Sequence, residues 1–186
     1  MFVRDFIHVE RPFQRVAPQF LRDPRWLHPI VDEAVGEAAR VSHALAGSTD
    51  GIDAVTNADI RLDTTPAGVR LERGAVRSRA HGLVVPISWS HVVDPTWFPP
   101  ISGDLEIAPI GLSRTELVLT ASYQAADSSG DSSPDRRGDA PDEAPSSGGL
   151  PDPMVVMHRV VEAGVRAFLQ HLAVALEAEF VDGPRR

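Results

Sequence analysis

Apolar residues recur three and four positions apart in the last long segment of the chain, residues 153–180. This is the spacing of one face of an α-helix, so it predicts a long amphipathic helix. The residues of that face are Val155, Val161, Val165, Phe168, Leu169, Leu172, Ala173 and Leu176. Such a face has to be buried, so we expect this helix to lie on a sheet or over a hollow in one.

Upstream of this helix the apolar period changes towards two, which is the period of β-strands. The clearest strand is predicted over residues 83–93, and its inner side carries Leu83, Val85, Ile87, Trp89 and His91. Residues 114–124 predict another strand, with Leu117, Leu119, Ala121 and Tyr123 on the inner side. Shorter or weaker strand signals lie at residues 2–10, 60–62, 69–71 and 105–107, with a hairpin turn at Arg73-Gly74.

Prolines at positions 12, 18 and 24 divide the segment after the first predicted strand into short pieces. Residues 13–21 suit one short helix. A second helix is expected to begin at Asp23-Pro24, an acidic cap followed by proline, and to run towards Leu45. Short connections between the strands favour antiparallel pairing, because parallel strands need long crossovers. The pattern therefore predicts an α+β fold.

Composition narrows the class of protein. A chain of 186 residues with 42% hydrophobic and 24% charged residues is expected to form one globular domain over residues 1–186. Residues 126–152 are rich in Ser, Gly, Pro and Asp, and we expect a disordered acidic loop there. The net charge of −8 argues against a nucleic-acid partner. Neither a membrane span nor a signal peptide is visible, so we expect no stable membrane insertion and a cytoplasmic protein.

Several local segments resemble one known superfamily. They are VVPISW at residues 84–89, WFP at 97–99, LEIAP at 105–109, TELVLTASY at 115–123 and HRVVE at 158–162. With the order of the predicted elements, they make the chain similar to an uncharacterised actinobacterial group of the START-like, or SRPBCC, superfamily. The resemblance implies the helix-grip fold: a curved antiparallel sheet, two short N-terminal helices, and a long C-terminal helix over an apolar cavity. Members bind lipids, sterols, hormones or polyketides, and some cyclise or aromatise polyketides.

The predicted ligand-binding residues are those of the inner strand faces and of the facing side of the last helix. They are Ile87, Trp89, His91, Leu105, Ile107, Leu117, Leu119, Tyr123, Val161, Val165 and Phe168. Trp89 and Tyr123 each combine an apolar ring with one polar group, which could orient a ligand or simply be satisfied within a packed core. His91 could act as an acid or base at a cavity mouth, or lie exposed at a strand end.

Other chemistry has little support in the sequence. Arg77, Arg79 and His81 alternate on one strand and could line the cavity, or could protect an exposed sheet edge. His158 and Glu162 share a helical face, but two ligands do not make a metal site. Cysteine is absent, and neither a nucleophile elbow nor a phosphate-binding loop is present. We therefore expect neither a metal nor a cofactor.

Three functions remain open on this evidence. The leading hypothesis is the binding of a small hydrophobic molecule, a lipid or a polyketide-like compound, between the sheet and the last helix. The first alternative is a cyclase or aromatase of the same fold, with Tyr123, His91 or an inner arginine as acid, base or oxyanion partner. The second alternative is an interaction module without a ligand cavity. The sequence decides neither whether a reaction is catalysed nor the oligomeric state.

Overall fold

The computed structural model describes residues 1–47, 68–91, 98–124 and 152–178, and the backbone alone at 46, 47 and 91. Its strands form one antiparallel sheet in the order β1-β6-β5-β4-β2, with β3 also paired to β4. The strands are β1 (Phe2–Val9), β2 (Val69–Arg73), β3 (Arg77–Arg79), β4 (Gly82–His91), β5 (Ile101–Ile110) and β6 (Arg114–Tyr123). This sheet confirms the antiparallel meander predicted from the alternating residues.

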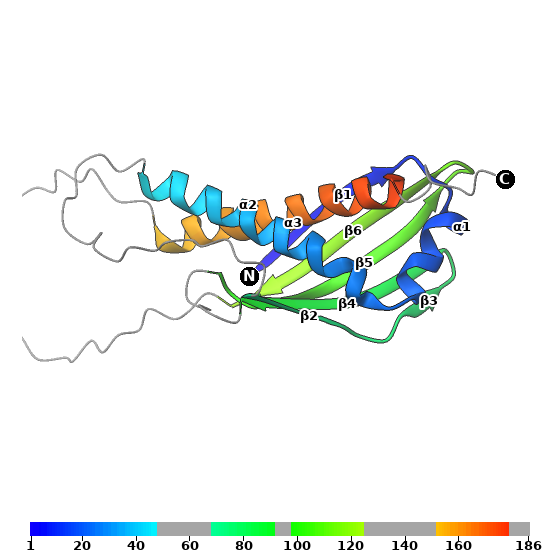
Figure 1. The fold of residues 1–186 in the computed structure, drawn as a ribbon, viewed down its shortest axis with the longest axis horizontal. Coiled ribbons are helices and arrows are strands. Elements are labelled where there is room, and N and C mark those ends of the chain that lie inside the picture. The colour runs from blue at the N-terminus through cyan, green and yellow to red at the C-terminus, as the bar shows by residue number, and fades with distance from the viewer. Residues whose placement is uncertain (48–67, 92–97, 125–151, 179–186) are drawn as a thin grey trace, which may run out of the picture.

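The helices form a second layer on one face of the sheet (Figure 1). They are α1 (Phe13–Val16), the 3-10 helices η1 (Ala17–Leu21) and η2 (Pro24–Leu27), α2 (His28–Gly47) and α3 (Pro153–Ala178). The side chain of Asp23 accepts a hydrogen bond from the backbone N–H of Arg25 at 3.0 Å, which confirms the predicted cap. The expected long helix then continues as α2.

The two long helices run antiparallel and touch each other. Glu33 of α2 lies 3.8 Å from His171 of α3, and Ala38 lies close to Gly164. Gly164 and the small Ala38 let the helix backbones approach, and the ring of Phe98 is wedged beside them. Because α3 contacts both the sheet and α2, its buried stripe is wide. That stripe comprises Val160, Val161, Gly164, Val165, Ala167, Phe168, Leu169, Leu172, Ala173 and Leu176.

The end of α3 is fastened to the end of β1. The backbone N–H of Glu10 donates to Glu177 Oε1 at 3.0 Å, and Arg11 donates to the carbonyl oxygen of Glu177 at 3.2 Å. Thr115, which is fully buried, donates to the carbonyl oxygen of Arg11 at 2.8 Å. These contacts fix the direction in which α3 crosses the sheet.

Gly103 allows two neighbouring strands to approach each other closely. It lies on the inner side of β5, where a Cβ atom would stand 2.3 Å from the carbonyl oxygen of Thr120 in β6. No real Cβ atom tolerates that distance, so any other residue here would push the strands apart.

Two sequence expectations need correction. Arg73-Gly74 is not a hairpin turn, because β2 and β3 both pair with β4 and the N–H of Gly74 donates to the carbonyl oxygen of Pro86 at 2.8 Å. Val155, expected on the buried helical face, is 49% exposed because it lies in the first turn of α3.

Two further expectations, the strand at residues 60–62 and the acidic loop except Asp152, lie outside the described residues. Those expectations stay predictions, as does the single domain. No helix in the described part of the chain is long and apolar enough to cross a membrane.

Candidate functional site

The candidate site is built on one row of residues that crosses the inner face of the sheet. Trp89 lies between Leu71 of β2 and Ile101 of β5, and Ile101 lies opposite Tyr123 of β6. Met1 continues the row beside Tyr123, since the backbone N–H of Tyr123 donates to its carbonyl oxygen at 3.1 Å. Trp89, Ile101 and Tyr123 are each at most 3% exposed. The row therefore combines buried apolar surface with two polar groups.

Tyr123 makes the main polar contact between this row and α3. Its hydroxyl oxygen lies 2.8 Å from Nδ1 of His158, and the two rings stack with centroids 6.2 Å apart. The same hydroxyl lies 3.0 Å from the sulfur of Met1. A hydroxyl has one proton, so it either donates to His158 or donates to the sulfur while accepting from His158. In both arrangements the phenol oxygen keeps acceptor capacity for a bound molecule.

The surroundings of Tyr123 favour its neutral form. Burial raises the pKa of this phenol above its ordinary value, and the negative charge of Glu162 on α3 raises it further. A neutral phenol can still donate a hydrogen bond at any physiological pH. Tyr123 is therefore equipped to hold or pass a proton next to His158.

Trp89 supplies the second polar group of the row. Its ring stacks on Phe168 of α3, with centroids 5.2 Å apart and an angle of 28° between the planes. The indole nitrogen is buried and has no hydrogen-bond partner among the residues that the structure describes. Since buried donors are normally paired, this nitrogen requires an explanation.

The other predicted binding residues occupy the same layer. Those on the strands and on α3 are buried, and they are Ile87, Leu105, Ile107, Leu117, Leu119, Val161, Val165 and Phe168. His91 is the last residue of β4, but its side chain is not among those described. The structure thus brings these eight buried residues into one apolar core cluster, while their contact with a ligand stays a prediction.

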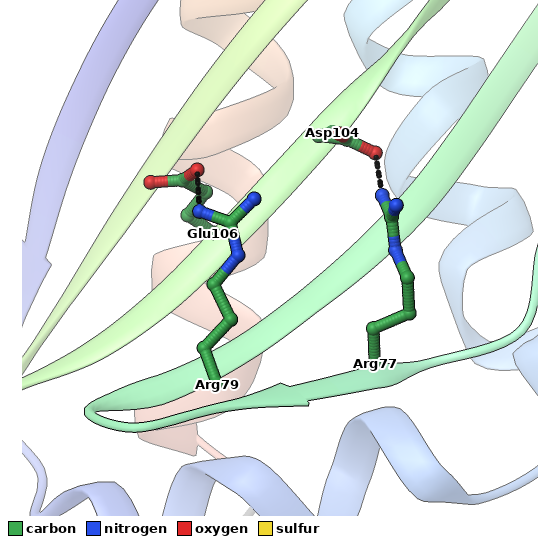
Figure 2. Close-up of polar contacts among 4 residues, drawn as sticks. All are labelled: Arg77, Arg79, Asp104 and Glu106. Carbon is green, nitrogen blue, oxygen red and sulfur yellow. Dashed lines mark hydrogen bonds and ion pairs between the residues drawn. The ribbon is translucent and has the colours of Figure 1, made fainter.

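Arg77 and Arg79 do not line the sheet–helix layer. Figure 2 shows them reaching from β3 across the sheet to β5, where Arg77 meets Asp104 at 2.8 Å and Arg79 meets Glu106 at 3.0 Å. Asp104 and Glu106 alternate with the buried Leu105, so these ion pairs lie on the outer face. His81 is exposed in the β3–β4 turn. The cavity-lining role considered for these three residues is therefore wrong.

Hollows lined by described residues also lie away from the inner row. One of about 390 Å³ lies over β1, β5 and β6, and its walls are mainly the polar outer residues Ser102, Asp104, Glu106, Thr120 and Ser122. Another, of about 450 Å³, lies at the β3–β4 turn. An interior cavity between the sheet and α3 remains a prediction.

His158 is the residue that the sequence did not assign to the site. It lies 35 positions after Tyr123, and helical periodicity alone does not show which strand residue a helix side chain will meet. The sequence grouped His158 only with Glu162, on one helical face, whereas the structure places its Nδ1 within hydrogen-bond distance of the Tyr123 hydroxyl. Within the described residues, no three His, Asp or Glu side chains are grouped so that they could hold a metal ion.

Comparisons with known proteins give structural matches only. No family model matches the chain, and no curated protein does. A conserved protein from Geobacillus kaustophilus matches 96% of this chain and 97% of its own, at 10% identity and a TM-score of 0.48. The Zhui aromatase/cyclase from Streptomyces sp. R1128 matches 99% of both chains, at 16% identity and a TM-score of 0.38. Ara h 8.0201 matches 96% of this chain and 98% of its own, at 10% identity and a TM-score of 0.41.

The fold itself can be read from the structure. The described strands form an antiparallel sheet of six, in the order β1-β6-β5-β4-β2 with β3 also paired to β4. Short helical segments come after β1, and the long helix α3 closes over the inner face. This arrangement is the helix-grip fold that the resemblance to the START-like superfamily implied.

Proposed function

We propose that the protein binds a small apolar molecule against the inner face of its sheet, beneath α3. The observation that carries the proposal is the Trp89 indole nitrogen, a buried donor without a partner in an otherwise apolar wall. Small-molecule sites are typically apolar surfaces with a few polar groups that orient the ligand. Trp89, Tyr123 and His158 supply such groups at one end of the layer.

The remaining wall of the site comes from the apolar residues of the same face. Leu105, Leu117 and Leu119 of the sheet belong to the same core cluster as Val161 and Val165 of α3. We propose that they, together with Ile87, Ile107, Phe168 and His91, contact the bound molecule. A lipid or a polyketide-like compound has the size and apolar character for such a surface.

Native mass spectrometry of the protein purified from its own host tests the proposal directly. We expect an organic molecule to remain bound in a one-to-one ratio. The uncharged dye Nile red, which fluoresces in apolar surroundings, should also bind saturably to protein stripped of this molecule. If neither a bound organic molecule nor saturable Nile red binding is detected, the result favours the interaction module without a ligand cavity.

Two matched substitutions on α3 locate the binding surface. Val161 is fully buried and faces the core, whereas Val174 is 65% exposed on the same helix. Val161→Met adds bulk to the layer and should weaken Nile red binding, while Val174→Met should leave it unchanged. An equal effect of both substitutions would show that the dye binds elsewhere.

An enzyme of the cyclase or aromatase type is the second candidate, and the Tyr123–His158 hydrogen bond favours it. A neutral phenol next to an imidazole can give its proton to a ketone oxygen, while the imidazole accepts the proton that the attacking carbon loses and passes it to the phenol oxygen. A linear triketone is a suitable test substrate, because its cyclisation changes its ultraviolet absorbance. Turnover unaffected by Tyr123→Phe and by His158→Ala would remove these residues from the reaction.

A further inference from the structure

The unpartnered indole nitrogen of Trp89 indicates what kind of group a bound molecule presents. An indole nitrogen can only donate a hydrogen bond, so it needs an acceptor. Trp89 is 2% exposed, which leaves it little access to solvent in place of a protein partner. An oxygen of a bound molecule would satisfy this donor, whereas a pure hydrocarbon would leave it unpaired.

An unpartnered indole alone does not identify a site, because Trp26 also has a buried nitrogen without a partner. Trp26 packs edge-on against Phe20, with ring centroids 5.4 Å apart, in the 3-10 segments after β1. Trp89 differs because its row also carries Tyr123 and, through Tyr123, His158. Of these two tryptophans, Trp89 is the one that lies on a strand of the sheet, in one row with a second polar side chain, Tyr123.

The charges around the layer indicate the second property of the bound molecule. Apart from Trp89 and Tyr123, the buried residues with polar side chains in the described part of the chain are Gln19 and Thr115, so no described arginine is buried in the core. Arg73, which is half-buried, already donates to the carbonyl oxygens of Phe20 and Arg22. The N-terminal ammonium of Met1 donates to the carbonyl oxygen of Tyr123 at 2.9 Å, three strands away from Trp89 in the row. An ionised carboxylate beside Trp89 would therefore lose its hydration without a cationic partner among the described side chains next to it.

The negative charge of Glu162 on α3 also disfavours an anionic ligand near Tyr123. Glu162 lies one helical turn after His158, and its charge adds to burial in raising the pKa of Tyr123. A charge that disfavours a phenolate at this position also disfavours a carboxylate. The site is electrostatically suited to a neutral molecule.

We propose that the molecule bound at the Trp89–Tyr123 row is uncharged and directs a hydrogen-bond acceptor, such as a ketone or ester carbonyl, at the indole N–H of Trp89. This inference rests on the proposed function and narrows it. It separates neutral carbonyl compounds from fatty-acid anions, which a merely apolar site would also accept.

Three naphthalene probes of similar size test the inference by displacement of Nile red at neutral pH. They are 2-acetylnaphthalene, which has a neutral acceptor, 2-ethylnaphthalene, which has none, and 2-naphthoate, which is ionised. We expect the ketone to bind about tenfold more tightly than the hydrocarbon, and at least about tenfold more tightly than the carboxylate. If the carboxylate or the hydrocarbon binds as tightly as the ketone, the inference is overturned while the proposed function stands. If Nile red itself does not bind, the proposed function fails.

Matched tryptophan variants locate the acceptor. Trp89→Phe removes the N–H and should reduce ketone affinity about tenfold while leaving hydrocarbon affinity unchanged. Trp26→Phe removes the other buried, unpartnered N–H and should change neither affinity. An equal effect of the two variants, or none from Trp89→Phe, would contradict the assignment.

A nuclear magnetic resonance measurement on the unaltered protein covers the case in which Trp89→Phe does not fold. The chain has three tryptophans and so three indole N–H signals, and Trp26→Phe identifies one of them. We expect one of the other two to shift downfield with the ketone but not with 2-ethylnaphthalene. Three unmoved indole signals at saturating ketone would overturn the inference.

Discussion

At the scale of single residues, Tyr123 is the point where the inner surface of the sheet is both buried and polar. Its ring is 3% exposed, yet its hydroxyl contacts His158 and Met1. Alternation along β6 predicted the inward direction of this ring. The partner could not be predicted, because the position of α3 relative to β6 depends on packing throughout the layer rather than on local spacing.

The raised pKa of Tyr123 predicts how stability depends on alkaline pH. Burial favours the neutral phenol in the folded protein, so the neutral phenol of Tyr123 contributes to the free energy of unfolding. This contribution is fully present below the ordinary tyrosine pKa of about 10. It is lost as pH rises through the higher folded value. Tyr123 is the only tyrosine, so the ultraviolet absorbance of tyrosinate reports its titration alone. We expect the midpoint of this absorbance titration to lie at a higher pH in the folded protein than in the unfolded chain.

Tyr123→Phe serves as the comparison for this titration. Loss of the hydrogen bond to His158 should lower the free energy of unfolding by about 1 kcal/mol at neutral pH. Phenylalanine does not ionise, so the variant loses no stability from this titration at alkaline pH. Its free energy of unfolding should therefore approach that of the parent as pH rises above about 10. A constant difference across this range would show that Tyr123 titrates alike in the folded and unfolded protein.

At the scale of secondary-structure elements, α3 is held by α2 as well as by the sheet. A Cβ atom on Gly164 would stand 3.3 Å from the ring of Phe98 and 3.4 Å from Ala38. Gly36 of α2 has open space where its Cβ would be. The periodicity of both helices was visible in the sequence, but their mutual packing was not, because it depends on small residues far apart in the chain.

These two glycines predict opposite effects on stability. Gly36→Ala should raise the free energy of unfolding by about 0.5–1 kcal/mol, because alanine favours a helix and meets no neighbour. Gly164→Leu should lower it by about 1–3 kcal/mol, because the side chain would force α2, Phe98 and α3 apart. Denaturant unfolding measures both. A neutral effect of Gly164→Leu would contradict the close helix contact.

The outer face of the sheet predicts a different dependence, on salt. The four side chains of the Arg77–Asp104 and Arg79–Glu106 pairs are 41–59% exposed, so each pair should contribute less than about 1 kcal/mol. Arg77→Ala and Arg79→Ala should reduce stability within this limit, and less in high salt. Neither should alter Nile red binding, since both side chains lie on the face away from α3. Weaker dye binding would place the probe on the outer face instead.

At the scale of the whole molecule, strict alternation and the 3.6-residue period made most of the sheet and α3 predictable. The predicted hairpin at Arg73-Gly74 was wrong, because the chain is interrupted there between β2 and β3 but does not reverse. Gly74 bonds to Pro86, so β2 and β3 extend along the same partner instead of forming a hairpin. Turn-forming residues indicate that a strand is interrupted. They do not show whether the chain then reverses as a hairpin or continues along the same partner strand after a bulge.

The sheet order predicts which backbone amides are best protected. β5 and β6 are each paired on both sides, whereas β1 and β2 lie at the ends of the strand order. We expect hydrogen exchange to be slowest in β5 and β6 and faster in β2, because end strands open without breaking the centre. Mass spectrometry of peptic fragments measures this order. Equally slow exchange in β2 would indicate an additional covering of that edge.

The pairing of β1 with β6 also affects how the protein is made. Phe2 lies opposite Ser122, so β1 leaves a ribosome well before its partner β6 has been synthesised. Meanwhile β1 would offer Phe2 and Phe6, which remain exposed even in the finished sheet, to other nascent chains. Refolding should accordingly be slow for a chain of this size, since its last-formed contacts join its most distant segments.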